Sequence, residues 1–176
     1  MYAILSPHYD DEALFLWSKL YGAAGFGWLA DPGYSRRVET ATLLAKYGSP
    51  NHFEFHGKLY EPTPLEGAVA KPLDSRDLDR VLNEFLQACS ARGVGKVLVP
   101  GIPPWGYDHP HHHQLLAEMA VKTTPLESCS VRVLDAGFKS WAWLQGYKSE
   151  APYLQEGAVV QRVLCSGTDF YEGFRI

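Results

Sequence analysis

The sequence predicts a single α/β domain over residues 1–176, with a mainly parallel β-sheet flanked by helices on both sides. Short apolar runs typical of buried strands alternate along the chain with longer segments of helical periodicity. A chain of 176 residues can form one core, because a domain of this size buries about 70% of the surface that its unfolded chain exposes. We find no linker, repeat or low-complexity tract that would divide it.

The first half of the chain alternates apolar and turn-forming segments. In chain order, the pattern predicts a strand at residues 2–5, a helix at 10–20, a loop at 22–33, a helix at 35–46, a strand at 53–55 and a proline-rich connection at 62–72. Acidic residues open the first helix, where they suit the positive end of its dipole. Ser35 is placed to cap the second helix.

The second half contains the clearest helix of the chain. Its apolar residues recur at i, i+3, i+4 and i+7 over residues 74–92 and stop at Gly93. Pro110 is placed to start a further helix, since proline is favoured at the first helical position. The remaining pattern predicts strands at residues 97–99, 131–134 and 159–165, and a loop at 100–108.

Composition and charge exclude several classes of protein. A formal charge of −4 with scattered Lys and Arg provides no footprint for nucleic acid. No apolar run approaches the roughly 18 residues of a membrane span, and no export signal opens the chain. Its three cysteines are an odd number without C-x-x-C spacing, which favours a reducing compartment. We therefore expect a cytoplasmic protein, as a monomer or a homo-oligomer.

Two polar clusters directly follow predicted strands, and ligands of open α/β sheets bind beyond the carboxyl ends of strands. In the first cluster, PHYDDE at residues 7–12, His8 and Asp11 are three residues apart and can converge on one ion. In the second, DHPHHH at residues 108–113, His109 can share a helical face with either His112 or His113. Together the clusters offer the nitrogen and oxygen ligands of a catalytic zinc site.

These segments resemble the motifs of the PIG-L/LmbE-like zinc-dependent de-N-acetylases. SPHYDDE at residues 6–12 is similar to the family's A/S-H-P-D-D-E, and HPHH at residues 109–112 is similar to its H-P-D-H. RRVE at residues 36–39 and EGF at residues 172–174 resemble its R-x-x-E helix and its E-x-F ending. The matches follow the family's order and span nearly the whole chain. Tyr9 stands where the family has proline, His111 replaces its aspartate, and the customary T-D-G is missing from residues 27–33.

The resemblance implies a fold and a set of roles. The fold is a Rossmann-like three-layer sandwich with a mainly parallel sheet. The metal ligands are His8, Asp11 and His112, the general base is Asp10, and His109 polarises the substrate. A protonated His109 would share the negative charge that develops on the carbonyl oxygen. His111 and His113 are expected in a supporting position or facing solvent.

The implied reaction removes an acetyl group from the nitrogen of an N-acetylated amino sugar or its conjugate, a small-molecule substrate. Arg36 is a candidate substrate-binding residue, although a solvated position at the helix start fits it equally well. The metal is expected to be Zn²⁺, while the same ligands accept Fe²⁺ or Co²⁺.

Two other functions stay open, because the chain is short in the loops that shape a sugar pocket. One is an amidase acting on a non-sugar N-acyl compound, and the other is a catalytically silent metal-binding protein of the same fold. A metallophosphoesterase is disfavoured, since the sequence lacks a D-x-H motif with the further ligands of a two-metal centre.

Overall fold

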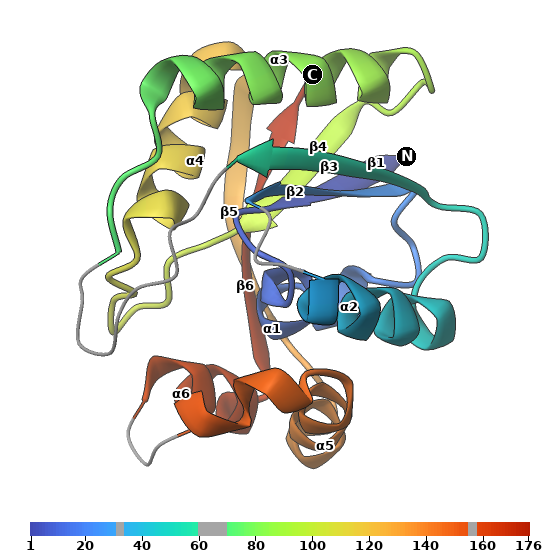
Figure 1. The fold of residues 1–176 in the computed structure, drawn as a ribbon, viewed down its shortest axis with the longest axis vertical. Coiled ribbons are helices and arrows are strands. Elements are labelled where there is room, and N and C mark those ends of the chain that lie inside the picture. The colour runs from blue at the N-terminus through green and yellow to red at the C-terminus, as the bar shows by residue number, and fades with distance from the viewer. Residues whose placement is uncertain (31–33, 60–69, 155–157) are drawn as a thin grey trace.

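The computed structural model describes residues 1–30, 34–59, 70–154 and 158–176. A six-stranded sheet with the order β3-β2-β1-β4-β6-β5 crosses the middle of the molecule (Figure 1). The strands are β1 (Tyr2–Ser6), β2 (Gly25–Ala30), β3 (Phe53–Leu59), β4 (Lys96–Pro100), β5 (Thr124–Arg132) and β6 (Thr168–Arg175). Strands β3, β2, β1 and β4 are parallel, and β6 runs antiparallel to both β4 and β5. The prediction of an α/β fold with a mostly parallel sheet is confirmed.

Helices cover both faces of the sheet. They are α1 (Asp11–Phe15), α2 (Tyr34–Tyr47), α3 (Ser75–Ser90), α4 (Pro110–Lys122), α5 (Ala136–Gly146) and α6 (Val159–Ser166), with short 3₁₀ helices at Trp17–Lys19 and Lys148–Tyr153. Figure 1 shows α3 above the sheet, α1 and α2 below it, and α5 and α6 at the bottom of the view. No helix in the described ranges is long and apolar enough to span a membrane.

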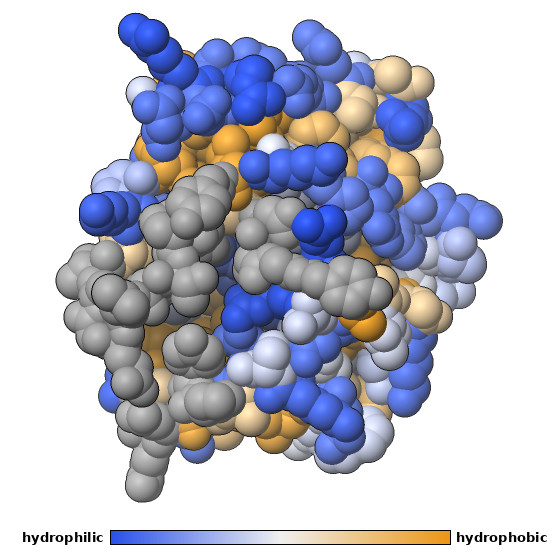
Figure 2. All heavy atoms as spheres, in the orientation of Figure 1, coloured by the Kyte–Doolittle hydropathy of each residue, from blue (hydrophilic) through white to orange (hydrophobic). Residues whose placement is uncertain are grey.

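Successive residues of a strand point to opposite faces of the sheet and pack into two separate hydrophobic cores. Ala3 and Leu5 pack with α3 and α4 on one face, whereas Ile4 packs with α1, α2, α5 and α6 on the other. Helix α3 has the apolar stripe that its sequence predicts, and Asp74 caps it by accepting hydrogen bonds from two backbone N–H groups. Figure 2 shows hydrophilic side chains over its outer surface, along the upper edge of the view, with hydrophobic residues beneath them.

The topology brings the two polar clusters to one edge. Strands β1 and β4 are parallel neighbours, with Ile4 opposite Leu98, so both strands end on the same side of the sheet. The chain order reverses between them, since β2 and β3 lie beyond β1 and the later strands beyond β4. Such a reversal leaves a crevice at the carboxyl ends of the two central strands.

Several predictions from local pattern are wrong. Residues 25–30 of the expected loop form β2, whereas residues 31–33 lie outside the described part of the chain. The expected strand at residues 159–165 is α6, in which Val159 and Val163, like Val160 and Leu164, are four residues apart on one face. Helix α1 ends at Phe15, and the next turn is 3₁₀. There Ser18 N–H donates to Asp169 Oδ2 on the distant β6 at 2.6 Å, a contact that local spacing does not reveal.

The remaining predicted elements are present with modest shifts in their bounds. The helix expected at residues 35–46 begins at Tyr34, the strand at 53–55 lies within the longer β3, and α4 begins at Pro110. The strand expected at 131–134 overlaps β5 only at residues 131–132. Helix α5 and strand β6 have no counterpart in the prediction. Residues 62–69 of the proline-rich connection lie outside the described part of the chain.

Candidate metal centre

Three predicted ligands converge beyond the ends of β1 and β4. His8 Nδ1 lies 3.0 Å from Asp11 Oδ2, and His112 Nε2 lies 3.2 Å from the same oxygen. The ligand atoms of the three residues all lie within 4.8 Å of one another. Two ligands held at 2.0–2.1 Å by a tetrahedral zinc ion are themselves about 3.3 Å apart, so this spacing fits such an ion.

The electrostatics of the three residues also favour a cation. All are buried, and neither ring nitrogen of His112 completes a hydrogen bond within the described ranges. Burial would raise the pKa of Asp11, but the His112 and His8 imidazoles hold it well below its usual range. Burial lowers the pKa of His112. An ionised carboxylate beside two buried imidazoles is a donor set that a divalent metal satisfies.

An aromatic wall surrounds His112. Its ring lies 4.7 Å from that of Tyr107 and 5.3 Å from that of Phe15, centroid to centroid. Both neighbours restrict the imidazole to one orientation. Hydrophobic surroundings of this kind lower the local dielectric constant and so strengthen the interaction of a ligand with a bound ion.

Asp10 has an unusual backbone conformation next to the ligand Asp11. Its φ of 119° lies in the left-handed region, which costs a non-glycine residue about 1–3 kcal/mol. Asp10 occupies the N-cap position of α1, yet its side chain makes no capping hydrogen bond. Capping therefore does not account for this aspartate.

A buried network beneath the site holds this conformation. The Glu12 carboxylate accepts hydrogen bonds from the backbone N–H of Asp10 at 3.1 Å and from the Trp28 indole N–H at 2.9 Å. The Tyr147 hydroxyl donates to the other Glu12 oxygen and lies 3.0 Å from the Thr40 hydroxyl. Burial raises the pKa of both Glu12 and Tyr147. No local sequence pattern predicts that these four residues support the site, since local spacing does not connect Glu12 to Tyr147.

His109 caps α4 and lies against His8. Its Nδ1 accepts a hydrogen bond from the His111 N–H, and its ring centroid is 4.5 Å from that of His8. Burial, reinforced by the neighbouring His8, lowers the pKa of His109 to about 3. His109 is therefore neutral at pH 7 in this environment, where the sequence analysis expected a protonated ring, and Nε2 carries its single N–H.

His111 is more deeply involved than expected, and His113 is not. The His111 ring is buried, and its Nδ1 lies 2.9 Å from His8 Nε2. A second group of potential ligand atoms thus comprises His8, His109 and His111. His113 is exposed, and its Nε2 lies 3.0 Å from the Tyr107 carbonyl oxygen. The sequence signal for His111 was its place within the second cluster.

Arg36 forms an ion pair with Glu150 of the 3₁₀ helix Lys148–Tyr153. In the same region Glu39 accepts a hydrogen bond from the Ser149 N–H at 3.0 Å. Both members of the R-x-x-E segment therefore attach α2 to this 3₁₀ helix. Substrate binding by Arg36 stays a prediction.

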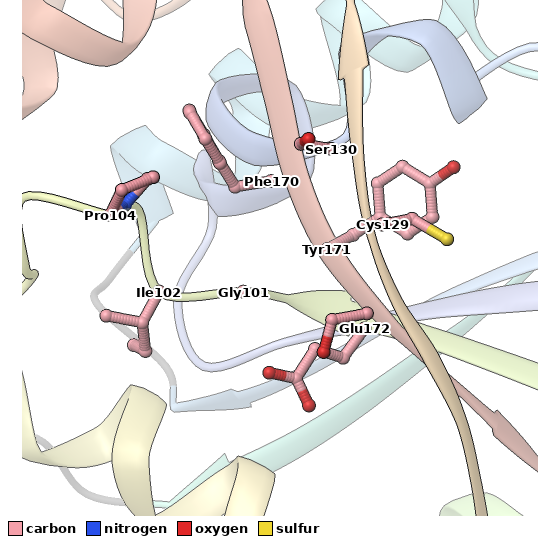
Figure 3. Close-up of a pocket in the computed structure, with 9 residues that line it drawn as sticks. Gly101, Ile102, Pro104, Cys129, Ser130, Phe170, Tyr171 and Glu172 are labelled. Atoms are coloured by element: carbon pink, nitrogen blue, oxygen red, sulfur yellow. The ribbon is translucent and has the colours of Figure 1, made fainter.

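A separate hollow of about 200 Å³ opens beyond the end of β4 (Figure 3). Gly101, Ile102 and Pro104 line one side of it, and residues 128–130 of β5 and 170–172 of β6 line the other. Its lining includes Glu172 of the E-x-F segment but none of the convergent histidines or Asp11. The hollow is therefore distinct from the candidate metal centre.

The chain matches no protein-family model, no curated protein and no solved structure. The geometry of the site and the motif resemblance are thus the basis for any function.

Proposed function

We propose that this chain is a metal-dependent hydrolase that removes an acetyl group from the nitrogen of an N-acetylated amino sugar or its conjugate. The observation that carries the proposal is the convergence of His8, Asp11 and His112 at the carboxyl ends of β1 and β4. Two nitrogens and one oxygen make three protein ligands, the number that leaves a position open in catalytic zinc sites. We further infer a Rossmann-like fold, which the β3-β2-β1-β4 order and its reversal between β1 and β4 support.

Zinc held by these residues would supply Lewis-acid activation of water and of the amide carbonyl, and Fe²⁺ or Co²⁺ suits the same donors. Asp10 is the proposed general base, because it adjoins Asp11 and is not engaged in capping. It takes a proton from the attacking water and returns it to the nitrogen of the leaving amine, so that acetate and free amine are the products.

His109 is the proposed electrophile. With Nδ1 occupied by the His111 N–H, its Nε2–H is the group that can donate to the developing negative charge on the carbonyl oxygen. A neutral imidazole performs this role without a change of protonation. Arg36 contacts the substrate in this proposal only if it exchanges its Glu150 partner for a substrate oxygen.

The test combines metal analysis with an assay of the purified protein. We expect about one zinc ion per chain, lost in His112→Ala but kept in His113→Ala, since His113 faces solvent on the same helix. The protein is then incubated with a panel of N-acetyl sugars, sugar conjugates and non-sugar N-acyl amines, and acetate and amine are quantified.

Release of acetate from sugar substrates alone supports the proposal. Activity confined to non-sugar amides would replace it with the amidase alternative. A folded, zinc-loaded protein that is silent on the whole panel would instead identify a metal-binding protein. Failure of the folded wild-type chain to take up zinc, Fe²⁺ or Co²⁺ would exclude all three.

A further inference from the structure

His111 connects His8 of the first polar cluster to the backbone of Lys71. Its Nδ1 lies 2.9 Å from His8 Nε2, and its Nε2 lies 2.7 Å from the carbonyl oxygen of Lys71. Both rings are buried, with exposures of 6% for His8 and 2% for His111. The contacts form a continuous chain that runs from the Lys71 carbonyl through two imidazoles to the face where Asp11 lies.

Hydrogen-bond chemistry assigns a direction to this chain. A carbonyl oxygen only accepts, so the proton of a neutral His111 must reside on Nε2, which leaves Nδ1 as an acceptor. His8 must then donate from Nε2, because two acceptors 2.9 Å apart would repel each other. The remaining ring nitrogen, His8 Nδ1, lies 3.0 Å from Asp11 Oδ2, where it can bind either a proton or a metal ion.

We propose that His111 is a positioning residue that holds a proton on His8 Nε2 and fixes the orientation of the ring, so that Nδ1 is the nitrogen that His8 offers to a metal beside Asp11 and His112. This inference rests on the proposed function in one respect, namely that His8 is a metal ligand. Partners that hold the second ring nitrogen of a ligating histidine also raise its basicity, and losing them typically costs about 10–100-fold in metal affinity. His111, which stands in place of the aspartate of the resembled motif, thereby strengthens metal binding without touching the ion.

The geometry offers one competing role for His111, as a ligand in the group of His8, His109 and His111. That role would direct the lone pairs of His8 Nε2 and His111 Nδ1 toward a second ion. It would leave the Lys71 hydrogen bond unchanged, so the tautomer of His8 is what separates the two roles. Only the positioning role places a proton on His8 Nε2.

Two substitutions and one control test whether the hydrogen-bond acceptor at His111 Nδ1 is needed. His111→Asn retains an acceptor, because the amide oxygen takes the place of Nδ1, whereas His111→Phe fills the buried space without one. His113→Phe is the matched control, since it changes an exposed histidine two residues along the same helix. Circular dichroism confirms folding of each variant.

The first readout is ¹⁵N nuclear magnetic resonance of the His8 ring in the metal-free wild-type protein. We expect a proton on Nε2, the nitrogen that faces His111 Nδ1. An unprotonated Nε2 in the wild type would overturn the proposal without reference to any variant. This measurement requires neither bound metal nor activity, so it stays informative if the proposed hydrolase function fails.

The second readout is zinc affinity by competition with a chelator. We expect His111→Phe to weaken binding by about 10–100-fold, with His111→Asn and His113→Phe remaining close to wild type. Equal affinity in His111→Phe and wild type would overturn the proposal while leaving the metal centre intact. Two zinc ions per wild-type chain, falling to one in His111→Phe at unchanged affinity, would show that His111 is a ligand and would equally overturn it.

Discussion

Asp10 combines an unfavourable backbone conformation with a position next to the candidate metal ligand Asp11. Its φ is positive, and its side chain makes no N-cap hydrogen bond. Holding such a conformation requires support, and the Glu12 carboxylate supplies it by accepting the Asp10 N–H. Two successive aspartates thus have different proposed roles, Asp11 as a metal ligand and Asp10 as the general base.

We predict that Asp10→Asn keeps the metal and lowers turnover by about 100-fold or more, the scale of a lost general base. Asparagine is suited to the test because it tolerates positive φ better than most residues. Metal content and acetate release are measured on the same preparation. Asp108→Asn, an exposed acidic residue beside the second cluster, should behave as wild type. Loss of metal in Asp10→Asn would mean that Asp10 is itself a ligand.

The residues of the candidate site could be predicted from the sequence, whereas the residues that hydrogen-bond to them and hold them in place could not. His8, Asp11 and His112 are brought together as predicted, because i, i+3 spacing and position after a strand are local signals. The hydrogen bond from Tyr147 to Glu12 joins residues 135 apart in the chain, and the His8–His111 contact joins residues 103 apart. No periodicity connects such pairs, since their meeting is a property of the folded sheet.

At the scale of elements, β2 shows why a strand was mistaken for a loop. Its sequence begins Gly-Phe-Gly, and glycine is depleted in strands. In the structure these glycines make room for aromatic side chains: a Cβ on Gly25 would lie 2.2 Å from the Phe53 ring, and one on Gly27 would lie 2.6 Å from the Phe85 ring of α3. The need for small residues arises from close packing on β2, which composition alone does not reveal.

We predict that Gly27→Ala destabilises the protein by about 1–3 kcal/mol, the usual cost of overpacking a core. The added methyl group would meet Phe85 and the Leu5 side chain, 2.9 Å away, on the buried face of the sheet. Urea unfolding measures the change in free energy. Gly95→Ala is the matched control, because nothing lies within 4 Å of its Cβ position, and it should stay within about 0.5 kcal/mol of wild type. Equal stability of the two variants would contradict this account of β2.

At the scale of the whole molecule, the parallel pairing of β1 and β4 makes one site out of two distant clusters. The position of each cluster after a strand predicted that they lie close together. The strand order explains it, since β2 and β3 are added on one side of β1 and the later strands on the other side, beginning with β4. This arrangement concentrates imidazole rings in one buried region, where the pKa values of His109 and His112 are both lowered. Folding stability should therefore depend on pH.

We predict that the metal-free protein loses stability through His109 as the pH falls from about 7 to about 5, and that His109→Asn reduces this loss. Burial lowers the pKa of His109 from 6.5 to about 3 in the folded chain. Between these values the unfolded chain binds a proton that the folded chain excludes, so the contribution is complete above pH 6.5 and declines as the pH falls toward 3. The limit for one proton is about 1.4 kcal/mol per pH unit, and half-exposed His109 should stay below it.

Glu12 acts in the opposite sense, because burial raises its pKa, so the comparison between variants is more informative than the wild-type slope alone. Urea unfolding at the two pH values gives the slope for wild type, for His109→Asn and for the exposed control His113→Asn. The control should keep the wild-type slope, and a slope in His109→Asn as steep as in wild type would show that His109 takes up its proton equally well in the folded and unfolded chains.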